Sequence, residues 1–403
     1  MCGLTPVARA ATPWRVSPEL LVRAGKRRDE LVKLVLAMAQ LDAPSGAGAP
    51  AMTAAADQLA ARLSGLPTAR LQRTAGEQGD VLEVRLGCGQ GVGVLILGHY
   101  DTVWPAGTAA SRPPGLSDDG RVIRGPGVFD MRGGIAATLV ALRLLADADP
   151  VRPVTVLLTP DEETGSATSE ERIVTLARQA EVVLVLEPPL PGGALKTSRR
   201  GWAVYRLMVT GRAAHAGLEP ERGVNAIDEL CDRLIDVREL AGVERGTTLN
   251  AGRIEGGGAP NVVPEHAEAL IDVRGTSVEE QERVDAALCA LKVRRPGASV
   301  EVSRLHLRPA MERSAAVADA FEHAQELAAA ELGIALREGA AGGTSDANLI
   351  AHLGVPVLDG LGPEGGGAHA LDEHILVDSL VERTALLALL VSSGRWTSPP
   401  GAG

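Results

Sequence analysis

The chain has 403 residues, a formal net charge of −11 and a hydrophobic content of 45%. This length is enough for two domains with a sizeable core, and the composition is typical of a globular protein. No dense run of Lys and Arg is present, which argues against nucleic-acid binding. The four cysteines form no CxxC pair, so a disulfide framework or a thiolate zinc site is not expected.

No apolar run approaches the roughly 18 residues that a membrane span needs. The N-terminal stretch MCGLTPVARAATPWRV also lacks the apolar core of a secretory signal. We therefore expect a cytoplasmic protein that binds neither membranes nor nucleic acids.

The first half of the chain predicts alternating strands and helices. A helix begins at the cap formed by Ser17 and Pro18 and runs to about Met38, and turn-rich residues 42–52 precede a second helix. Apolar strands are expected at 80–86, 92–98, 153–159 and 182–186, with helices at 132–146 and 168–180. This α/β alternation predicts a mixed, mainly parallel sheet covered on both faces.

The pattern changes after residue 196. Strands near 202–211, 247–254, 267–274 and 299–305, with helices near 221–241 and 278–291, predict an α+β sandwich of the ferredoxin-like kind. The α/β style returns with a helix near 314–332, a strand at 355–359 and a helix near 378–392. We therefore expect one domain from residues 1–196 and 309–403, interrupted by a domain over 197–308.

Ionisable side chains follow the predicted parallel strands at the point where each strand ends. His99 and Asp101 follow the strand at 92–98, Glu162 and Glu163 follow the strand at 153–159, and Glu187 follows the strand at 182–186. The Gly-rich loop GPGVFD adds Asp130, and the late loop GPEGGGAHALDEH adds His369. Ligands bind at the carboxyl ends of parallel strands, so the topology brings these side chains to one edge.

This concentration of carboxylates needs a source of positive charge. Each residue alone has an ordinary explanation as a cap, a turn residue or a solvated surface group. Together, however, the carboxylates would cost several kcal/mol in repulsion and desolvation unless cations compensate them. Imidazole with carboxylate suits a pair of Zn(II) ions, with Co(II) or Mn(II) as alternatives.

Seven motifs in order and spacing resemble the M20 family of metallopeptidases, in particular its glutamate carboxypeptidase (carboxypeptidase G) branch. The resemblance runs from about residue 90 to 385 and includes GHYDTVWPAG, GPGVFDMRGGIAA, TPDEETGS, VLEPP, TGRAAHAG, APNVVPEHAEALIDVR and GAHALDEHI. It implies a zinc-peptidase (phosphorylase/hydrolase-like) catalytic domain interrupted by a ferredoxin-like lid domain. Through that lid the chain would form a homodimer.

The resemblance also implies a role for each residue at the strand ends. His99 and Glu187 would bind one zinc ion, Glu163 and His369 the other, and Asp130 both. Asp101 would act by holding the His99 imidazole. A cis peptide is expected between Asp130 and Met131. His374 competes with His369 for the late ligand, and the motif GAHALDEH favours His369.

The adjacent glutamates then have separate tasks. In an extended segment neighbouring side chains point in opposite directions, so Glu163 would face a metal while Glu162 faces a metal-bound water. The metals lower the pKa of that water. Glu162 would act as the general base that takes its proton and later returns it to the leaving nitrogen.

A second set of residues matches the family's substrate contacts. His215 resembles a histidine that reaches across the dimer to steady the carbonyl oxygen. Asn261 and Arg274 resemble substrate or oxyanion contacts, with a structural role for Arg274 left open. Arg308 resembles an arginine that binds a substrate carboxylate, for which a guanidinium is well shaped. Gly343 and Thr344, in the loop GGTSD, are expected beside it.

These features predict a di-zinc hydrolase that cleaves an amide bond next to a free carboxylate, on a small molecule or a short peptide. A carboxypeptidase that releases a C-terminal residue such as glutamate is favoured, or one that hydrolyses an N-acyl amino acid. The alternative in the same class is a deacylase of the acetylornithine or succinyl-diaminopimelate type. A non-catalytic dimeric binding protein of the same fold is the alternative in another class.

Overall fold

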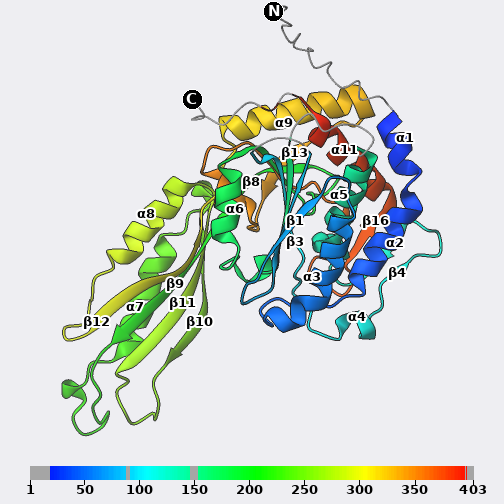
Figure 1. The fold of residues 1–403 in the computed structure, drawn as a ribbon. Helices are drawn as coiled ribbons and strands as arrows, with labels where there is room; N and C mark the ends of the chain where they lie inside the picture. The colour runs from blue at the N-terminus through cyan, green and yellow to red at the C-terminus, as the bar shows by residue number, and fades with distance from the viewer. Residues whose placement is uncertain (1–18, 88–90, 146–152, 395, 397–403) are drawn as a thin grey trace, which may run out of the picture. The chain divides into compact units, whose positions relative to one another are not determined.

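The computed structural model describes residues 19–87, 91–145, 153–394 and 396, and Figure 1 shows their fold. The chain divides into two compact units. The first unit contains Met1–Leu195, Val317–Glu338 and Val355–Gly403, and the second contains Lys196–Ala316 and Gly339–Gly354.

A six-stranded sheet forms the centre of the first unit. Its order is β1 (Arg70–Thr74), β2 (Val81–Leu86), β6 (Val154–Thr159), β3 (Gly93–His99), β7 (Ala180–Val185) and β14 (Val357–Leu358). The strands from β6 to β14 run parallel, whereas β1, β2 and β6 pair antiparallel. The predicted mixed, mainly parallel sheet is confirmed. Every residue of β3 and β6 is buried, as their continuous apolar sequences indicate.

The first unit also contains helices, most of which contribute apolar side chains to its core. They are α1 (Glu19–Gly25), α2 (Arg28–Ala39), α3 (Ala49–Ser64), the short α4 (Thr108–Ser111), α5 (Gly133–Leu144), α6 (Glu170–Ala177), α9 (Ala315–Leu327) and α11 (Val377–Ser392). Helix α5 is almost entirely buried and packs against α1, α2 and α11. Its Gly134 lies so close to the end of β7 that an added Cβ would stand 2.5 Å from the carbonyl oxygen of Leu186. Only glycine permits this approach, which sets where Glu187 emerges.

The single helix predicted up to Met38 is wrong, because the structure breaks it after Gly25. The break lies between α1 and α2, and glycine is among the weakest helix formers. The cap predicted at Ser17 and Pro18 lies outside the described residues.

A small second sheet joins two distant segments of the first unit. Its order is β15 (Gly365–Gly366), β16 (His374–Leu376), β5 (Val122–Arg124) and β4 (Gly115–Leu116). Strand β16 pairs antiparallel with β5, which places the loop at 367–373 beside the loop that follows β5. Strands of two or three residues carry no readable periodicity, and the sequence did not predict them.

The second unit contains the predicted ferredoxin-like arrangement. Its elements are β9 (Gly201–Thr210), α7 (Ala226–Glu239), β10 (Thr248–Gly256), β11 (His266–Gly275), α8 (Val278–Cys289) and β12 (Ser299–Arg308). The antiparallel sheet has the order β10-β11-β9-β12. Alternate residues of β9 and β11 face a core shared with α7 and α8. A two-stranded sheet of β8 (Leu195–Arg199) and β13 (Glu338–Ala341) and the short helix α10 (Ala347–Ala351) complete the described fold.

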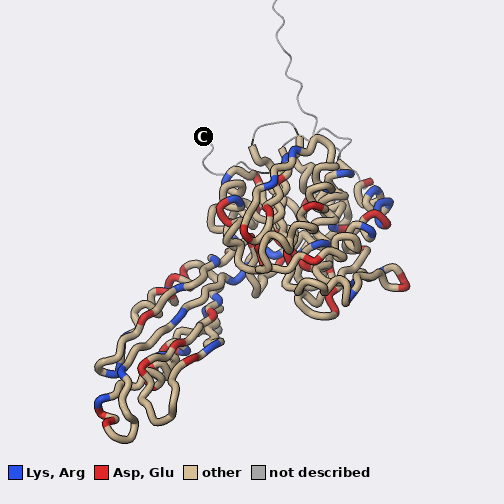
Figure 2. The backbone as a smooth tube through the Cα atoms, turned by 60° about the horizontal axis from the view of Figure 1, so that its bottom comes forward, with Lys and Arg blue, Asp and Glu red and all other residues tan. Residues whose placement is uncertain are grey.

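Acidic and basic positions are interspersed along both units, as Figure 2 shows. Across the ranges that the structure describes, no helix is long and apolar enough to cross a membrane.

Candidate metal centre

The ends of three neighbouring parallel strands bring ionisable side chains together. Strand β3 ends at His99 and leads to Asp101, and β7 leads to Glu187. These three side chains are buried, with exposed fractions of 1%, 0% and 7%. Strand β6 leads to Glu162 and Glu163 in the turn that follows it. The predicted edge of the sheet is therefore where these residues lie.

Asp130 lies between two imidazoles. Its Oδ1 atom is 3.1 Å from Nε2 of His99, and its Oδ2 atom is 3.6 Å from Nε2 of His369. The aspartate belongs to an irregular turn, Val128–Arg132, and the cis peptide expected between Asp130 and Met131 is confirmed. The two oxygens of one carboxylate thus face two different histidines.

Each histidine also faces a second carboxylate. Oε1 of Glu187 is 3.7 Å from Nε2 of His99, and Oε1 of Glu163 is 3.2 Å from Nε2 of His369. We call His99, Asp130, Glu163, Glu187 and His369 the His–carboxylate cluster. It contains two sets of one nitrogen and two oxygens, which share Asp130.

The nitrogen-to-oxygen separations in both sets are compatible with ligands of a metal ion. A tetrahedral zinc with bonds of about 2.0–2.1 Å has neighbouring ligand atoms about 3.3 Å apart. The separations from the histidine nitrogen to the carboxylate oxygens in each set, 3.1 to 3.7 Å, lie on both sides of that value. His99, Asp130 and Glu163 also offer three ligand atoms within 4.8 Å of one another, an arrangement that could hold a metal ion.

His369 adopts a backbone conformation that favours glycine. Its φ is +61°, in the left-handed region, and its side chain is half-exposed. Non-glycine residues adopt this conformation uncommonly, and such positions cluster at functional sites. The rival His374 begins β16, and its Nδ1 atom lies 2.8 Å from the carbonyl oxygen of Asp372 in its own loop. The structure therefore brings His369 to the cluster and gives His374 a local partner.

The electrostatics of the cluster show a demand for positive charge. Burial lowers the pKa of His99, but hydrogen bonds with Asp101, Asp130 and Glu187 outweigh it and raise the pKa well above its usual value. Hydrogen bonds with Asp130 and Glu163 raise the pKa of His369 to about 10. Burial raises the pKa of Asp130, yet its hydrogen bonds with both histidines leave the pKa far below the usual range. The metal-free cluster therefore holds protons where cations would bind.

Asp101 connects His99 to the glutamate turn. Nδ1 of His99 lies 3.2 Å from Oδ1 of Asp101, and the amides of Glu162 and Glu163 donate to the same carboxylate at 3.3 and 3.2 Å. Ser45 adds a hydroxyl donor at 2.8 Å from Oδ2. Ser45 was not predicted as a site residue, because it lies in a loop 56 residues before Asp101 and only the fold brings the two together.

The adjacent glutamates lie in a turn rather than in an extended segment. Glu162–Thr164 form a single 3₁₀ turn, so the extended geometry expected for this pair is wrong. Successive side chains of a 3₁₀ helix still diverge, because each residue is rotated by about a third of a turn. Asp161 stabilises the segment by accepting from the amide of Thr168 at 2.7 Å and from the hydroxyl of Ser169.

His215 lies on the second unit with a defined tautomer. The amides of Gly217 and Leu218 both donate to its Nδ1 atom at 3.1 Å. Since Nδ1 must be the acceptor, a neutral His215 carries its proton on Nε2. The segment of His215 also pairs with that of Asn261, whose carbonyl oxygen accepts from Ala216 at 2.9 Å. The structure therefore brings His215 and Asn261 together.

The other predicted substrate contacts form two local groups in the second unit. Arg274 donates to both oxygens of Asp272 at 3.0 and 3.1 Å and lies over the ring of Trp202. Arg308 is 4% exposed, and one of its nitrogens lies 3.5 Å from Asp346. Asp346 belongs to the same loop as Gly343 and Thr344, which are exposed and half-buried. The structure therefore groups Arg308 with this loop.

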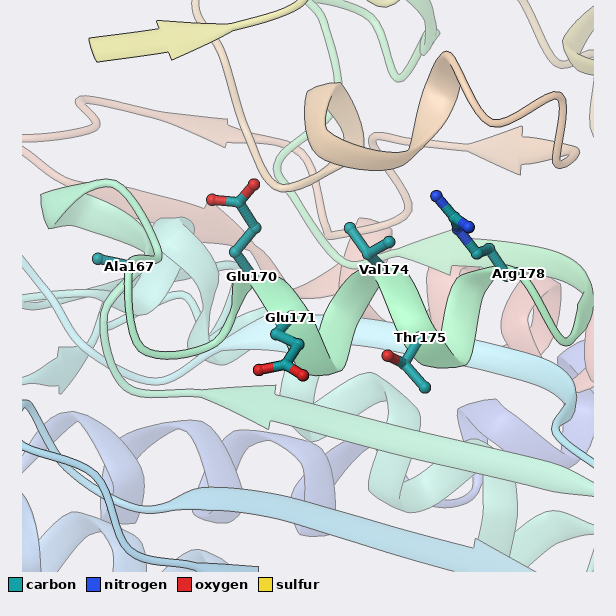
Figure 3. A pocket seen from close by; sticks show the side chains of 6 residues that line it. All are labelled: Ala167, Glu170, Glu171, Val174, Thr175 and Arg178. Carbon is teal, nitrogen blue, oxygen red and sulfur yellow. The ribbon is translucent and has the colours of Figure 1, made fainter. Parts of the chain in front are cut away.

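A surface hollow of about 530 Å³ lies along α6. It is lined by Ala167, Glu170, Glu171, Val174, Thr175 and Arg178. Figure 3 shows Glu170, Val174 and Arg178 projecting from one side of the helix and Glu171 and Thr175 from the other. None of its lining residues belongs to the His–carboxylate cluster, so the chemistry of the cluster does not extend to it.

Comparison with known proteins identifies the class of this chain. The model of peptidase family M20/M25/M40 matches residues 95–393. Carboxypeptidase G2 of Pseudomonas sp. (strain RS-16) is 30% identical over 399 residues, which cover 96% of this chain and 94% of that protein. The chain therefore belongs to the M20 family and is an enzyme of the metallopeptidase or amidohydrolase type, as expected from its motifs.

Two further comparisons agree with this assignment. The succinyl-diaminopimelate desuccinylase of Xanthomonas campestris pv. campestris (strain 8004) is 31% identical over 328 residues, covering 75% of this chain and 84% of that enzyme. The crystal structure of aminopeptidase PepT from Bacillus cereus ATCC 10987 has the same fold. It aligns with a TM-score of 0.72 at 24% identity, covering 94% of this chain and 98% of that one.

Zinc binding should depend on pH because both imidazoles hold protons in the metal-free chain. The pKa of His369, about 10, lies above neutral pH, so zinc must displace its proton. The apparent zinc affinity should therefore rise at least about tenfold per pH unit between about pH 6 and pH 8. Competition with a chromophoric chelator measures this affinity, and calorimetry in buffers of different ionisation enthalpy counts the released protons.

A matched variant sharpens this measurement. In His369→Gln the number of released protons should fall by one, because one imidazole has been removed. An affinity that stays constant with pH, or zinc binding without proton release, would contradict the charge state described for the cluster.

Proposed function

We propose that this enzyme is a di-zinc hydrolase that cleaves an amide bond next to a free carboxylate. The observation that carries the proposal is the position of Asp130, whose two oxygens face His99 and His369 separately. His99 and Glu187 would hold one zinc ion, and His369 and Glu163 the other. A single ion would leave one of these nitrogen–carboxylate sets without a metal.

The protein's own groups would orient and protonate the reactants. When bound, the zinc ions would lower the pKa of a coordinated water and polarise the substrate carbonyl. Asp101 holds Nδ1 of His99 and so directs the Nε2 lone pair toward the cluster. Glu162 would take the proton of the attacking water and return it to the leaving nitrogen. His215 would donate from Nε2 to the carbonyl oxygen, which its tautomer supports.

Arg308 would recognise the free carboxylate of the substrate. A guanidinium presents paired N–H donors that suit a planar carboxylate. Its neighbour in the structure is Asp346, in the loop that also carries Gly343 and Thr344. A substrate carboxylate bound beside this loop could accept from both the guanidinium and the main-chain amides. Asn261 and Arg274 are the further contacts expected for the substrate or its oxyanion.

Replacing Glu162 by Gln should reduce kcat by about 10²- to 10⁴-fold, because the amide cannot accept a proton in the reaction. Zinc content, measured by mass spectrometry of the purified protein, should stay at the wild-type level. Glu170→Gln is the matched control, since Glu170 is an exposed residue of α6 only eight positions later. Wild-type turnover in Glu162→Gln would remove Glu162 from the mechanism.

A deacylase is the second candidate, because the sequence identity of this chain to the desuccinylase, 31%, is about the same as its identity to the carboxypeptidase, 30%. The carboxypeptidase is favoured because its match covers 96% of the chain against 75% for the desuccinylase. We expect the zinc-loaded enzyme to hydrolyse N-acyl and peptidyl glutamates with a higher kcat/KM than succinyl-diaminopimelate or acetylornithine. The reverse order would favour the deacylase.

The cytoplasmic location expected from the sequence also stays a prediction, which subcellular fractionation would test.

We also propose that the enzyme forms a homodimer through the second unit. Strand β10 is an edge of its sheet, nine residues long and mostly exposed. Helix α7 presents an apolar stripe at helical spacing, with Ile227 36% exposed, Ile235 52% exposed and Cys231 exposed between them. Ile254 of β10, 58% exposed, is paired with the core-facing Ala269 and so lies on the helix-covered face of the sheet. An unpaired edge beside an apolar stripe favours pairing with a second copy.

Charge placed on this surface should disrupt the dimer. The double substitution Ile235→Lys and Ile254→Lys should convert a wild-type dimer into monomers, because it would bury unpaired charges in the interface. Light scattering after size exclusion measures the mass. Val293→Lys is the control, since Val293 is also exposed (43%) but lies outside β10 and α7. A monomeric wild-type protein at micromolar concentration would rule the proposal out.

A further inference from the structure

The carboxylate of Glu373 is buried beside the His–carboxylate cluster and accepts hydrogen bonds from four N–H groups. Glu373 is 1% exposed and lies just before β16. Its Oε1 atom accepts from the amides of Phe129 and Asp130 at 3.0 and 3.2 Å. Its Oε2 atom accepts from the amide of Gly127 and the indole of Trp104, each at 2.8 Å. The donors thus fill both oxygens of one side chain.

These donors come from the segments that carry His99 and Asp130, and Glu373 itself lies in the segment that carries His369. Asp130 donates its own amide to Glu373. Trp104 lies five residues after His99, in the loop that follows β3. Glu373 itself lies four residues after His369, and its amide closes the turn of that loop by donating to Ala370 at 3.1 Å. One carboxylate therefore joins the His99, Asp130 and His369 segments.

The loop that carries Asp130 depends on this acceptor. Residues 125–127 are neither helix nor strand, and Gly127, just before the irregular turn Val128–Arg132, has a φ of +69°. Successive amides in such a loop point toward one centre and form a nest for an anion. Here the anion is the carboxylate of Glu373. The main-chain carbonyl of Glu373 also accepts from the amide of Gly125 at 3.2 Å. Without the carboxylate these buried amides would lose their partners.

We infer that Glu373 is a positioning residue of the metal centre, which holds Asp130 so that one of its oxygens faces His99 and the other faces His369. The inference rests on the proposed di-zinc function. It assigns Glu373 no contact with the substrate and no proton transfer. Its effect would pass through the backbone of Asp130 and would appear first in metal affinity.

Glu373→Gln is the direct test. The side chain keeps its size, but its amide nitrogen would face N–H donors where an oxygen accepted them. Zinc affinity, measured by chelator competition, should fall about 10- to 100-fold, which is typical when a group that orients a metal ligand is lost. Added zinc should restore most of the lost turnover with KM unchanged. Wild-type zinc affinity in a folded Glu373→Gln protein would overturn the inference.

Two further variants separate positioning from general stability. Glu229→Gln alters another fully buried carboxylate, which accepts from the amides of Arg294 and Arg295 at 2.9 and 2.8 Å in the second unit. It should lower the unfolding temperature and leave zinc affinity unchanged. Trp104→Phe removes one of the four donors and should weaken zinc binding by less than Glu373→Gln does. If Glu373→Gln does not fold, unchanged zinc affinity in Trp104→Phe overturns the inference.

The same measurements distinguish this inference from the proposed function. A wild-type protein that binds no zinc would refute the metal centre itself. A wild-type protein that binds zinc but cleaves none of the amide substrates would refute only the proposed reaction. Tight zinc binding by both the wild type and Glu373→Gln would refute only the role of Glu373.

Discussion

The carboxylate of Asp130 lies between two imidazoles that are far apart in the sequence, and the fold of the first unit brings them together. His99 ends the central strand of the sheet, whereas His369 belongs to a late loop. The small sheet that pairs β16 with β5 brings this loop next to the segment of Asp130. Because the site is largely buried, the charges of these groups interact strongly, and protons or metal ions must balance the carboxylates.

Irregular loops around the cluster are held by carboxylates that accept main-chain amides. Asp101 accepts from Glu162 and Glu163, and Glu373 accepts from the loop that carries Asp130. Asp42 does the same for the loop after β3, at Gly107 and Ala109. Loops without regular hydrogen bonding need other acceptors, and a carboxylate offers about four acceptor sites at once. Some of the acidic residues near the cluster therefore organise its loops instead of binding metal.

Sequence patterns predicted the helices and strands that have a clear hydrophobic periodicity. They missed the short elements and the contacts between residues that are distant in sequence. The apolar strands at the centre of the sheet and the alternating strands of the second unit have a clear periodicity, and their ends located His99, Asp101 and Glu187. His369 carries no periodic signal, and only its motif indicated it. The two-residue strands, the 3₁₀ turn at Glu162 and the break after Gly25 are decided locally or by distant partners. Ser45 and Glu373 act through segments that are remote in sequence, which spacing cannot show.

The tautomer of His99 and of His215 depends on the hydrogen-bond partners of the Nδ1 atom. In His99, Nδ1 faces two oxygens of Asp101, the carboxylate at 3.2 Å and the main-chain carbonyl at 3.1 Å, so this nitrogen must carry a proton. When the second proton leaves Nε2, that atom has a lone pair with which it could bind a cation. In His215, Nδ1 instead meets two amides, which forces the proton onto Nε2 and makes that atom a donor. In the proposed mechanism the same side chain would thus act as a metal ligand in one unit and as a hydrogen-bond donor in the other, because the groups that face its Nδ1 atom are opposite in polarity.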